Sequence, residues 1–255
     1  MARALIGHTG FVGSNLLQQA EFDDVFRSVD IEAIAGRDYD LVVCAGAPGT
    51  KWLANQDPAQ DRASVERLAA ALQRVTARHF VLISTVDVFG APIGVDETAE
   101  VDDSATAYGR HRRWLEQVLG ARFTACTVLR LPGLFGPGLK KNLIFDLLHG
   151  DLGGREWPNA VFQLYDLGWL WRDIERARAA GIPLLHLATE PTAVREIAEQ
   201  GFGVTLPRIA AAPGARYDLR TRYDVELGGA AGYLYGKSQV LDALRQFLAA
   251  QGWPR

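Results

Sequence analysis

Three glycines spaced three residues apart stand between an apolar run and a helical pattern near the N-terminus. The run Arg3–Ile6 predicts a strand, and the apolar periodicity over Phe11–Ala20 predicts a helix. Gly7, Gly10 and Gly13 fall in and just after the connecting turn, where a tight bend, a close approach of backbone to ligand and close helix–strand packing all exclude a side chain. This order predicts a turn whose backbone N–H groups bind a diphosphate.

Strands and helices alternate beyond this turn. Apolar runs predict strands at 24–28, 41–45, 79–84 and 124–131, and helical periods predict helices at 60–77 and 106–119. In the helix at 60–77, Val65, Leu68, Leu72 and Val75 form the apolar stripe, and Asp61 is expected to face away from it. Such alternation implies right-handed crossovers and a doubly wound parallel sheet with helices on both faces. Because the segment between residues 28 and 41 is short, we expect that one strand–helix unit of the doubly wound pattern is missing there.

The remaining sequence is less regular. Helices are expected at 143–149, 167–179, 192–200 and 238–250, and short strands at 184–188 and 204–206. We therefore predict an α/β fold: a Rossmann-like dinucleotide-binding domain over residues 1–138, and a small C-terminal α+β lobe over residues 139–255 that packs on the same core and covers the substrate.

The net charge and the cysteine content argue against several kinds of partner and site. The 27 basic and 30 acidic residues give a net charge of −3, so we expect neither nucleic acid nor an anionic membrane surface as partner. No apolar run is long enough to span a membrane, and the N-terminus is typical of a strand rather than a signal peptide. Cys44 and Cys126 are expected to be reduced thiols in a cytoplasmic protein, and no metal site is expected.

The end of the second strand bears on the cofactor. A carboxylate at this position favours NAD, whereas a basic residue favours NADP. Here Arg27 can pair with a 2′-phosphate with help from Ser28, and Asp30 and Ile31 can instead hold the adenine edge. The alternative is that Arg27 is an ordinary exposed arginine. The sequence thus leaves NADP and NAD open, with Arg27 favouring NADP.

Five short motifs follow one another in a fixed order. They are Gly7–Gly13, Cys44–Ala47, Ile83–Gly90, Ala107–Gly109 with Glu97 before it, and Leu129–Gly138. In this order they resemble the extended short-chain dehydrogenase/reductase family, the group of NAD-dependent epimerases, dehydratases and sugar-nucleotide reductases. The resemblance covers residues 3–138, whereas no specific motif of the family was found in the C-terminal part.

The resemblance implies a Tyr that acts as acid/base beside a nicotinamide. Tyr108 occupies that place, and Thr85 occupies the place of the Ser or Thr that donates to the substrate oxygen. The family's lysine, four residues after the Tyr, lowers the pKa of the Tyr and holds the nicotinamide ribose. Here the position is Arg112, which keeps the charge but is a planar fork rather than a compact ammonium.

The remaining site predictions concern the cofactor and the substrate. Lys51, Lys141 and Asn142 are candidate substrate contacts at the carboxyl edge of the sheet and after the Gly-Pro-Gly segment. The residues expected to bind NADP or NAD are Gly7, Thr9, Gly10, Phe11, Val12, Gly13, Arg27, Ser28, Asp30, Ile31, Cys44, Ala45, Gly46 and Pro132.

Two functions remain open. The first is an enzyme that acts on a hydroxyl or keto carbon of a small molecule, a nucleotide sugar by resemblance; reduction, epimerisation and dehydration are not distinguished. The second is a catalytically silent NAD(P)-binding sensor or scaffold, which the replacement of the family's lysine favours and the retention of Tyr108 and Thr85 opposes. The resemblance also implies a homodimer.

Overall fold

The computed structural model describes residues 2–150, 159–206 and 214–253, which fall into two compact units. Unit 1 comprises Met1–Ala91, Ala99–Leu131 and Gly168–Leu185. Unit 2 comprises Pro92–Thr98, Pro132–Leu167 and His186–Arg255. The chain therefore passes between the units several times. The predicted domains at 1–138 and 139–255 stay a prediction.

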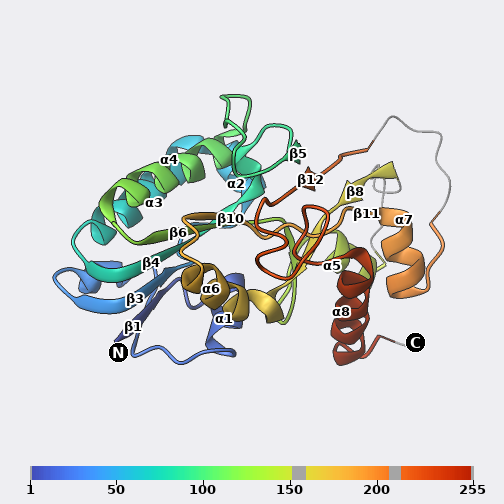
Figure 1. Ribbon diagram of the computed structural model, residues 1–255, viewed down its shortest axis with the longest axis horizontal. Coiled ribbons are helices and arrows are strands. Elements are labelled where there is room, and N and C mark those ends of the chain that lie inside the picture. The colour runs from blue at the N-terminus through green and yellow to red at the C-terminus, as the bar shows by residue number, and fades with distance from the viewer. Residues whose placement is uncertain (1, 151–158, 207–213, 254–255) are drawn as a thin grey trace. The chain divides into compact units, whose positions relative to one another are not determined.

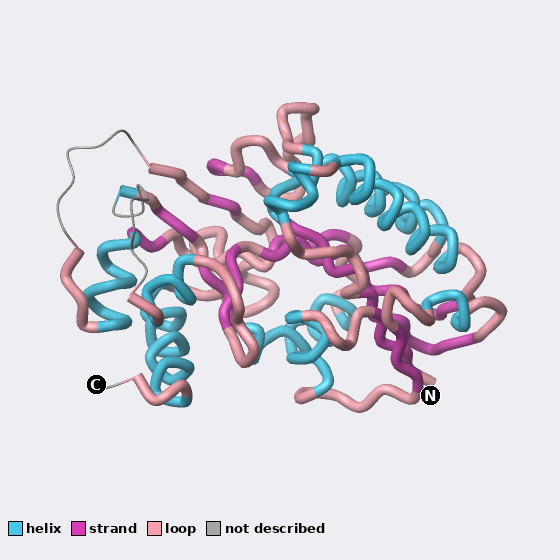
Figure 2. Tube along the Cα trace, turned by 180° about the vertical axis from the view of Figure 1, so that it is seen from behind, coloured by secondary structure: helices cyan, strands magenta, loops and turns pink. Residues whose placement is uncertain are grey.

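A six-stranded sheet forms the centre of unit 1 (Figures 1 and 2). Its spatial order is β10-β6-β4-β3-β1-β2, and the strands β1, β2, β3, β4 and β6 pair in parallel. The strands are β1 (Arg3–Ile6), β2 (Asp24–Phe26), β3 (Asp38–Cys44), β4 (Thr76–Thr85), β6 (Cys126–Leu131) and β10 (Leu184–His186).

Helices cover both faces of this sheet (Figure 1). One face carries α1 (Phe11–Leu17) and α6 (Leu170–Ala179), and the other carries α2 (Lys51–Gln56), α3 (Pro58–Leu72) and α4 (Ala107–Arg122). The predicted Rossmann-like, doubly wound α/β fold is confirmed. The helix α2 was not predicted, because its six residues are too short for a helical period to stand out.

The expected loss of one strand–helix unit is also confirmed. Among the described residues, β2 is the edge strand beside β1, and no further strand follows it. The chain returns through the short 3₁₀ helix η1 (Ile31–Ile34) to β3 on the opposite side of β1. The strand order therefore reverses between β1 and β3, and such a reversal places a crevice at the carboxyl ends of these two strands.

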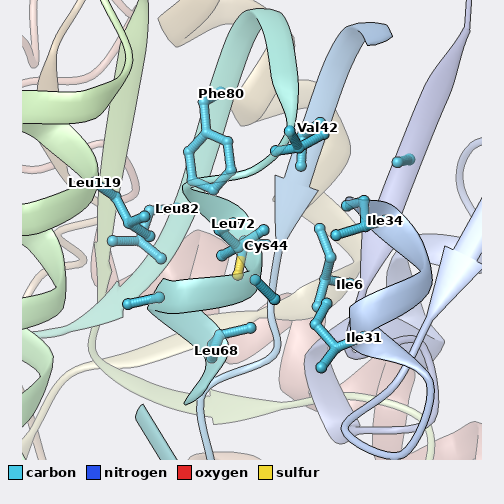
Figure 3. Packing of buried hydrophobic residues seen from close by; sticks show 14 of the residues in the cluster. Ile6, Ile31, Ile34, Val42, Cys44, Leu68, Leu72, Phe80, Leu82 and Leu119 are labelled. Carbon is cyan, nitrogen blue, oxygen red and sulfur yellow. The ribbon is translucent and has the colours of Figure 1, made fainter. Parts of the chain in front are cut away.

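The core of unit 1 lies between the sheet and the helices of one face (Figure 3). Strand residues such as Val42, Phe80 and Leu82 pack against Leu72 and Leu119 from α3 and α4. Each is at most 1% exposed. Burying a side chain of this size contributes roughly 1.5–3 kcal/mol before conformational entropy is subtracted, so the sheet edge on which the site is built is held rigidly.

Unit 2 combines short strand pairs with helices. β7 pairs with β9, β8 with β11, and β5 with β12. The elements are β5 (Ile93–Val95), β7 (Gly133–Phe135), α5 (Leu143–Leu148), β8 (Val161–Phe162), β9 (Leu164–Asp166), β11 (Thr192–Ala193), α7 (Val194–Glu196), the π-helix η5 (Ile197–Phe202), β12 (Asp218–Leu219) and α8 (Lys237–Ala250).

Two predictions for this unit are wrong. The helix expected from Thr192 begins only at Val194, because Thr192 pairs with Phe162 in an antiparallel register. The strand expected at 204–206 does not form. Gly203 ends η5 in the left-handed region with φ +70°, and the Val204 N–H donates back to the Ala198 carbonyl.

Candidate functional site

The glycine turn after β1 has no room for side chains. Gly7 has φ +84°, and a methyl group added to it would lie 2.3 Å from the Ala45 carbonyl oxygen. A methyl group on Gly13 would lie 2.2 Å from the Gly7 carbonyl oxygen. At Gly10 the corresponding contact is 3.2 Å, so this position is less strictly confined. The turn is thus packed between the start of α1 and the end of β3, as the glycine spacing predicts.

The end of β3 lies beside this turn. The Ala45 N–H donates to the Ile6 carbonyl at 2.9 Å, which continues the pairing of β1 with β3 by one residue. A methyl group on Gly46 would lie 2.7 Å from the Ile6 side chain. Cys44 itself is buried under the edge, and burial raises the pKa of its thiol to about 12. Cys44 is therefore a core residue here.

A pocket of about 150 Å³ opens at the same edge. It contains the predicted cofactor residues Ser28, Ile31 and Gly46. Sequence reasoning missed the others, which come from the end of β1, the loop after β3 and α3, where no local pattern marks a pocket. The full lining is Ile6, Ser28, Ile31, Gly46, Pro48, Ser64, Arg67 and Leu68. All of these residues belong to unit 1.

Arg27 and Asp30 are bound to each other just beyond β2. The Asp30 carboxylate accepts from the Arg27 N–H at 2.6 Å, and its other oxygen lies 3.4 Å from Arg27 Nε. Both side chains are about half exposed. A guanidinium in this position stays accessible to a phosphate.

Thr85 and Tyr108 are brought together from two elements. Thr85 is the last residue of β4, and its side chain accepts from the Asp87 N–H at 3.1 Å. Tyr108 lies in the first turn of α4, where its own N–H donates to Asn55 Oδ1 of α2 at 3.0 Å. The Thr85 hydroxyl acts on the phenol of Tyr108 and lowers its pKa. This pair matches the predicted juxtaposition, although its catalytic role stays a prediction.

Several groups act on the phenol of Tyr108. Burial raises its pKa above the ordinary value near 10, and the nearby Asp87 carboxylate raises it further. Arg112, Lys51 and the hydrogen bond to Thr85 lower the pKa, but they do not outweigh burial. Without a ligand, Tyr108 is therefore a neutral proton donor at physiological pH.

Arg112 is buried beside Tyr108. Its guanidinium is 3% exposed and forms a two-pronged ion pair with Asp61 of α3, at 2.5 Å and 2.9 Å. It also donates to the carbonyls of Pro48 and Tyr108, and its Cζ lies 3.9 Å from the centre of the Tyr108 ring. Arg112 lowers the pKa of Tyr108, as expected, but burial outweighs it. Its predicted contact with the nicotinamide ribose stays a prediction.

Asp61 corrects a second expectation. Its side chain is 4% exposed rather than facing away, and it also accepts from, or pairs with, His111 Nδ1 at 2.7 Å. The spacing of Asp61, Val65, Leu68 and Leu72 is four, three and four residues, which is the period of the buried stripe. This spacing was the feature of the sequence that indicated a buried Asp61. It was missed because a charged residue is normally expected to face solvent.

Lys51 lies at the start of α2 in an ion pair. Its Nζ is 2.7 Å from Asp87 Oδ1. Asp87 in turn belongs to the short 3₁₀ helix η2 (Val86–Val88), directly after Thr85. Lys51 is thus part of the Thr85–Tyr108 region of unit 1, and its predicted contact with substrate stays a prediction.

Thr9, Phe11 and Val12 belong to the glycine turn and the start of α1 in unit 1, whereas Pro132, Lys141 and Asn142 lie in unit 2. Pro132 directly follows β6 and is buried. Asn142 caps α5, because its amide oxygen accepts from the N–H groups of Ile144 and Phe145 while its amide nitrogen donates to the Leu134 carbonyl. Its backbone has φ 143°, which these bonds hold. Asn142 therefore has a structural role. The predicted substrate contacts of Asn142 and of the exposed Lys141 stay predictions, as does the predicted cofactor contact of Pro132.

Glu97 also has a structural role. Its carboxylate accepts from the N–H groups of His186 and Arg222 and from the Thr221 hydroxyl, so it ties three segments of unit 2 together. Among the residues that the structure describes, no group of three or more His, Cys, Asp and Glu could hold a metal ion. In the same described part of the chain, no helix is long and apolar enough to cross a membrane.

Comparison with known proteins agrees with the geometry. Residues 24–150, about half of the chain, match the model of the NAD dependent epimerase/dehydratase family. The chain belongs to this family. The resemblance to the extended short-chain dehydrogenases/reductases is thereby confirmed. No curated protein matches the sequence.

Solved structures of the epimerase/dehydratase type share the fold over the whole chain. A dTDP-4-dehydrorhamnose reductase from Bacillus anthracis in complex with NADP is 17% identical, with 98% of this chain and 99% of that one covered and a TM-score of 0.75. A UDP-glucose 4-epimerase from Thermotoga maritima with UDP-glucose is 15% identical, with 98% and 99% covered and a TM-score of 0.70. RMD from Pseudomonas aeruginosa complexed with NADPH is 17% identical, with 98% and 100% covered and a TM-score of 0.70.

Proposed function

We propose that this family member is an NAD(P)-dependent enzyme of the oxidoreductase or epimerase type that acts on a hydroxyl or keto carbon of a nucleotide sugar. The observation that carries the proposal is that Thr85, at the end of β4, acts on the phenol of Tyr108 in the same unit as the glycine turn and the 150 Å³ pocket. The turn follows β1, the pocket borders the end of β3, and Thr85 ends β4, so all three share the carboxyl edge of neighbouring parallel strands.

The residues present fit a nicotinamide dinucleotide. Gly7 and Gly13 allow the turn to pack closely, because a methyl group at either position would clash with backbone. The backbone N–H groups of such a turn can bind a diphosphate. The pocket is smaller than the roughly 300–1,000 Å³ of sites for drug-sized ligands, so it suits one part of a dinucleotide, such as the adenine. Ile6, Ile31 and Leu68 provide apolar walls for a base.

A bound nicotinamide would supply hydride transfer at its ring. In this proposal the Tyr108 hydroxyl gives or takes the proton on the substrate oxygen, and the Thr85 hydroxyl orients that oxygen by a hydrogen bond. Arg112 holds the Tyr108 ring by stacking over its face, with its own position fixed by Asp61. Arg27 at the mouth of the β2 turn favours a 2′-phosphate and hence NADP.

The molecules bound in the structural neighbours support the same class of ligand. The neighbours include proteins solved with NADP, with NADPH, with NAD and UDP-glucose, and with UDP-glucose alone. A nucleotide-sugar substrate and a nicotinamide cofactor are carried from them to this chain as part of the proposal. A homodimer and a cytoplasmic location are also retained as proposals.

One observation favours the second candidate function. Because the Arg112 guanidinium is committed to Asp61 and Pro48, it is not directed at a ribose. A chain that lost this contact can still bind a dinucleotide without turnover. The second candidate is therefore a silent NAD(P)-binding sensor or scaffold.

The test combines binding with turnover. NADPH and NADH are titrated into the wild type and into Tyr108→Phe, with nicotinamide fluorescence as readout, and both proteins are assayed on dTDP-keto sugars and UDP-glucose. We expect both proteins to bind, and Tyr108→Phe to lose about 10²–10⁴-fold of the turnover rate, the usual contribution of a general acid/base. Tyr39→Phe is the control, because this phenol lies near the amino end of β3 and bonds Asp24.

Four outcomes are distinguished. Turnover that depends on Tyr108 but not on Tyr39 supports the enzyme. Binding without any turnover supports the silent binder, and turnover unchanged in Tyr108→Phe removes the catalytic assignment. Absence of binding of either dinucleotide contradicts both candidates.

A further inference from the structure

The pocket of about 150 Å³ carries a basic side chain on α3. Arg67 lines this pocket together with Ser64 and Leu68 of the same helix. Arg67 and Leu68 lie three and four positions after Ser64, so all three share the face of α3 that borders the pocket. Leu68 is buried and forms part of the wall, whereas Arg67 is exposed. Arg67 is therefore a basic group on the solvent side of the pocket.

The Arg67 guanidinium is not committed to another residue. Across residues 2–150, 159–206 and 214–253, no hydrogen bond, ion pair or ring contact holds its side chain. Glu66, its neighbour on α3, pairs instead with Arg62 at 2.6 Å. Glu32 of η1 pairs with Arg74 at 3.2 Å. Arg67 therefore brings an uncompensated positive charge to the pocket, and this charge favours an anionic ligand group.

Arg27, the basic residue that the sequence analysis points to, differs from Arg67 in this respect. It is not among the described residues that line the pocket. Its Nε lies 3.4 Å from the Asp30 carboxylate, which also accepts from the Arg27 N–H. An anion that approaches Arg27 therefore also approaches a negative charge, which opposes its binding.

The other residues of the pocket suit an adenosine. Ile6, Ile31 and Leu68 are each at most 7% exposed and form its apolar side (Figure 3). Ser28, which follows β2, adds an exposed hydroxyl to the lining. A base that packs on the apolar side leaves its ribose to the polar residues. A phosphate on that ribose can then contact Ser28 and Arg67.

We propose that Arg67, with the Ser28 hydroxyl, holds the 2′-phosphate of NADP and is the main determinant of a preference for NADP over NAD. This rests on the proposed function, in which the pocket takes the adenine part of the dinucleotide. A guanidinium suits this task, because its planar fork donates two parallel hydrogen bonds to a phosphate. Arg27 adds less, since Asp30 balances its charge.

The test compares two probes that differ only in the 2′-phosphate, ADP-ribose and 2′-phospho-ADP-ribose. Their Kd values are measured by calorimetry with the full chain. We expect Arg67→Gln to weaken binding of 2′-phospho-ADP-ribose roughly 10- to 100-fold, the size expected for loss of a charged hydrogen-bond partner, and to leave the Kd of ADP-ribose unchanged. Arg67→Lys keeps the charge without the fork and should fall between wild type and Arg67→Gln.

The matched control is Arg78→Gln. Arg78 is also an exposed arginine of unit 1, but it lies near the start of β4, at the opposite edge of the sheet, and pairs with Asp40 at 3.3 Å. Its loss changes the net charge equally and should leave both Kd values in place. Arg27→Gln is measured beside it and should weaken 2′-phospho-ADP-ribose less than Arg67→Gln does.

Several results would overturn the proposal. Equal weakening of both probes in Arg67→Gln would make Arg67 a contact of the base or diphosphate instead. Unchanged affinity, a larger effect of Arg27→Gln, or an equal effect of Arg78→Gln would also contradict it, as would a wild type that binds neither probe.

The probes contain no nicotinamide, so this test is independent of turnover. If Arg67 discriminates between the probes but no sugar is turned over, the proposed enzyme fails while the present inference holds. If NADPH binds and Tyr108 supports turnover while Arg67→Gln leaves both Kd values unchanged, only the present inference fails.

Discussion

At the scale of single residues, a buried cluster of charges decides how Tyr108 is presented. Asp61, His111 and Arg112 come from α3 and α4; Asp61 forms a short ion pair with Arg112 and a hydrogen bond with His111. A buried ion pair costs desolvation, so such a cluster persists only when its geometry is good and its partners are complete. One Arg112 atom, Nε, is buried without a hydrogen-bond partner in the described residues. The cluster therefore restrains the Tyr108 ring at a cost in stability.

Removing Asp61 should be strongly destabilising. Asp61→Asn leaves the buried Arg112 charge without its counter-ion, which typically costs about 3–5 kcal/mol of the free energy of unfolding. Urea unfolding at pH 7 measures this difference. Asp103→Asn, at an exposed carboxylate, is the control and should lie within about 0.5 kcal/mol of the wild type.

The same carboxylate predicts a pH dependence. Burial disfavours ionisation of Asp61, but the bonds and charges of Arg112 and His111 prevail, so its pKa lies below the ordinary value of 3.8. Its contribution is then present above that ordinary value and is lost as pH falls through the lower folded-state pKa. Wild type and Asp61→Asn should converge in stability toward acid pH; a gap that is constant with pH would contradict this.

At the scale of elements, the ends of parallel strands carry the site. Residues after β1 and β3 and at the end of β4 lie on adjacent strands, so segments far apart in sequence share one edge. The glycine turn depends on backbone contact rather than on side chains. Its most confined position is Gly13, where α1 meets the Gly7 carbonyl.

Gly13→Ala should therefore damage both the turn and dinucleotide binding. The added methyl group would lie 2.2 Å from a backbone oxygen, so α1 must shift away from the turn. We expect a loss of roughly 1–3 kcal/mol in stability from overpacking and at least a tenfold weaker affinity for NADPH, measured by urea unfolding and by fluorescence.

The control for this prediction is Gly120→Ala in α4. Nothing lies within 4 Å of a methyl group there, and the site is helical, so the change should stabilise by up to about 1 kcal/mol. NADPH affinity should not change in this variant. Equal behaviour of the two variants would refute the packing argument.

At the scale of the whole molecule, the glycine turn and the pocket proposed to bind the dinucleotide lie within one unit. The glycine turn and every residue that lines the 150 Å³ pocket belong to unit 1. A ligand that binds only the folded form of a unit stabilises it by mass action, by about 2.7 kcal/mol at a hundredfold excess over its Kd.

Hydrogen exchange should show this division. ADP-ribose and its 2′-phosphate, which contain adenine and diphosphate but no nicotinamide, should slow amide exchange in β1, β3 and η1. They should leave exchange in α8 of unit 2 unchanged. Mass spectrometry of peptic fragments measures both; protection confined to α8, or absent from β1 and β3, would contradict the assignment of this half of the site.

The sequence by itself determined the features that depend on local chemistry. Glycine is required at positions 7 and 13 because the turn packs there without space for a side chain. Unbroken apolar runs such as Leu41–Cys44 predict buried parallel strands. The order of the motifs then predicted that Thr85 and Tyr108 belong to one site. These inferences held because periodicity, turn geometry and motif spacing are properties of short segments.

Only the tertiary structure decided which charges meet. Asp61 and Arg112 are separated by 51 positions, and Lys51 and Asp87 by 36, so no local pattern links them. Their pairing follows from the packing of α2, α3 and α4 on the sheet, and it holds Arg112 against the Tyr108 ring. Electrostatic partners depend on distances of a few ångström between elements, which the packing of the core fixes and the sequence does not show.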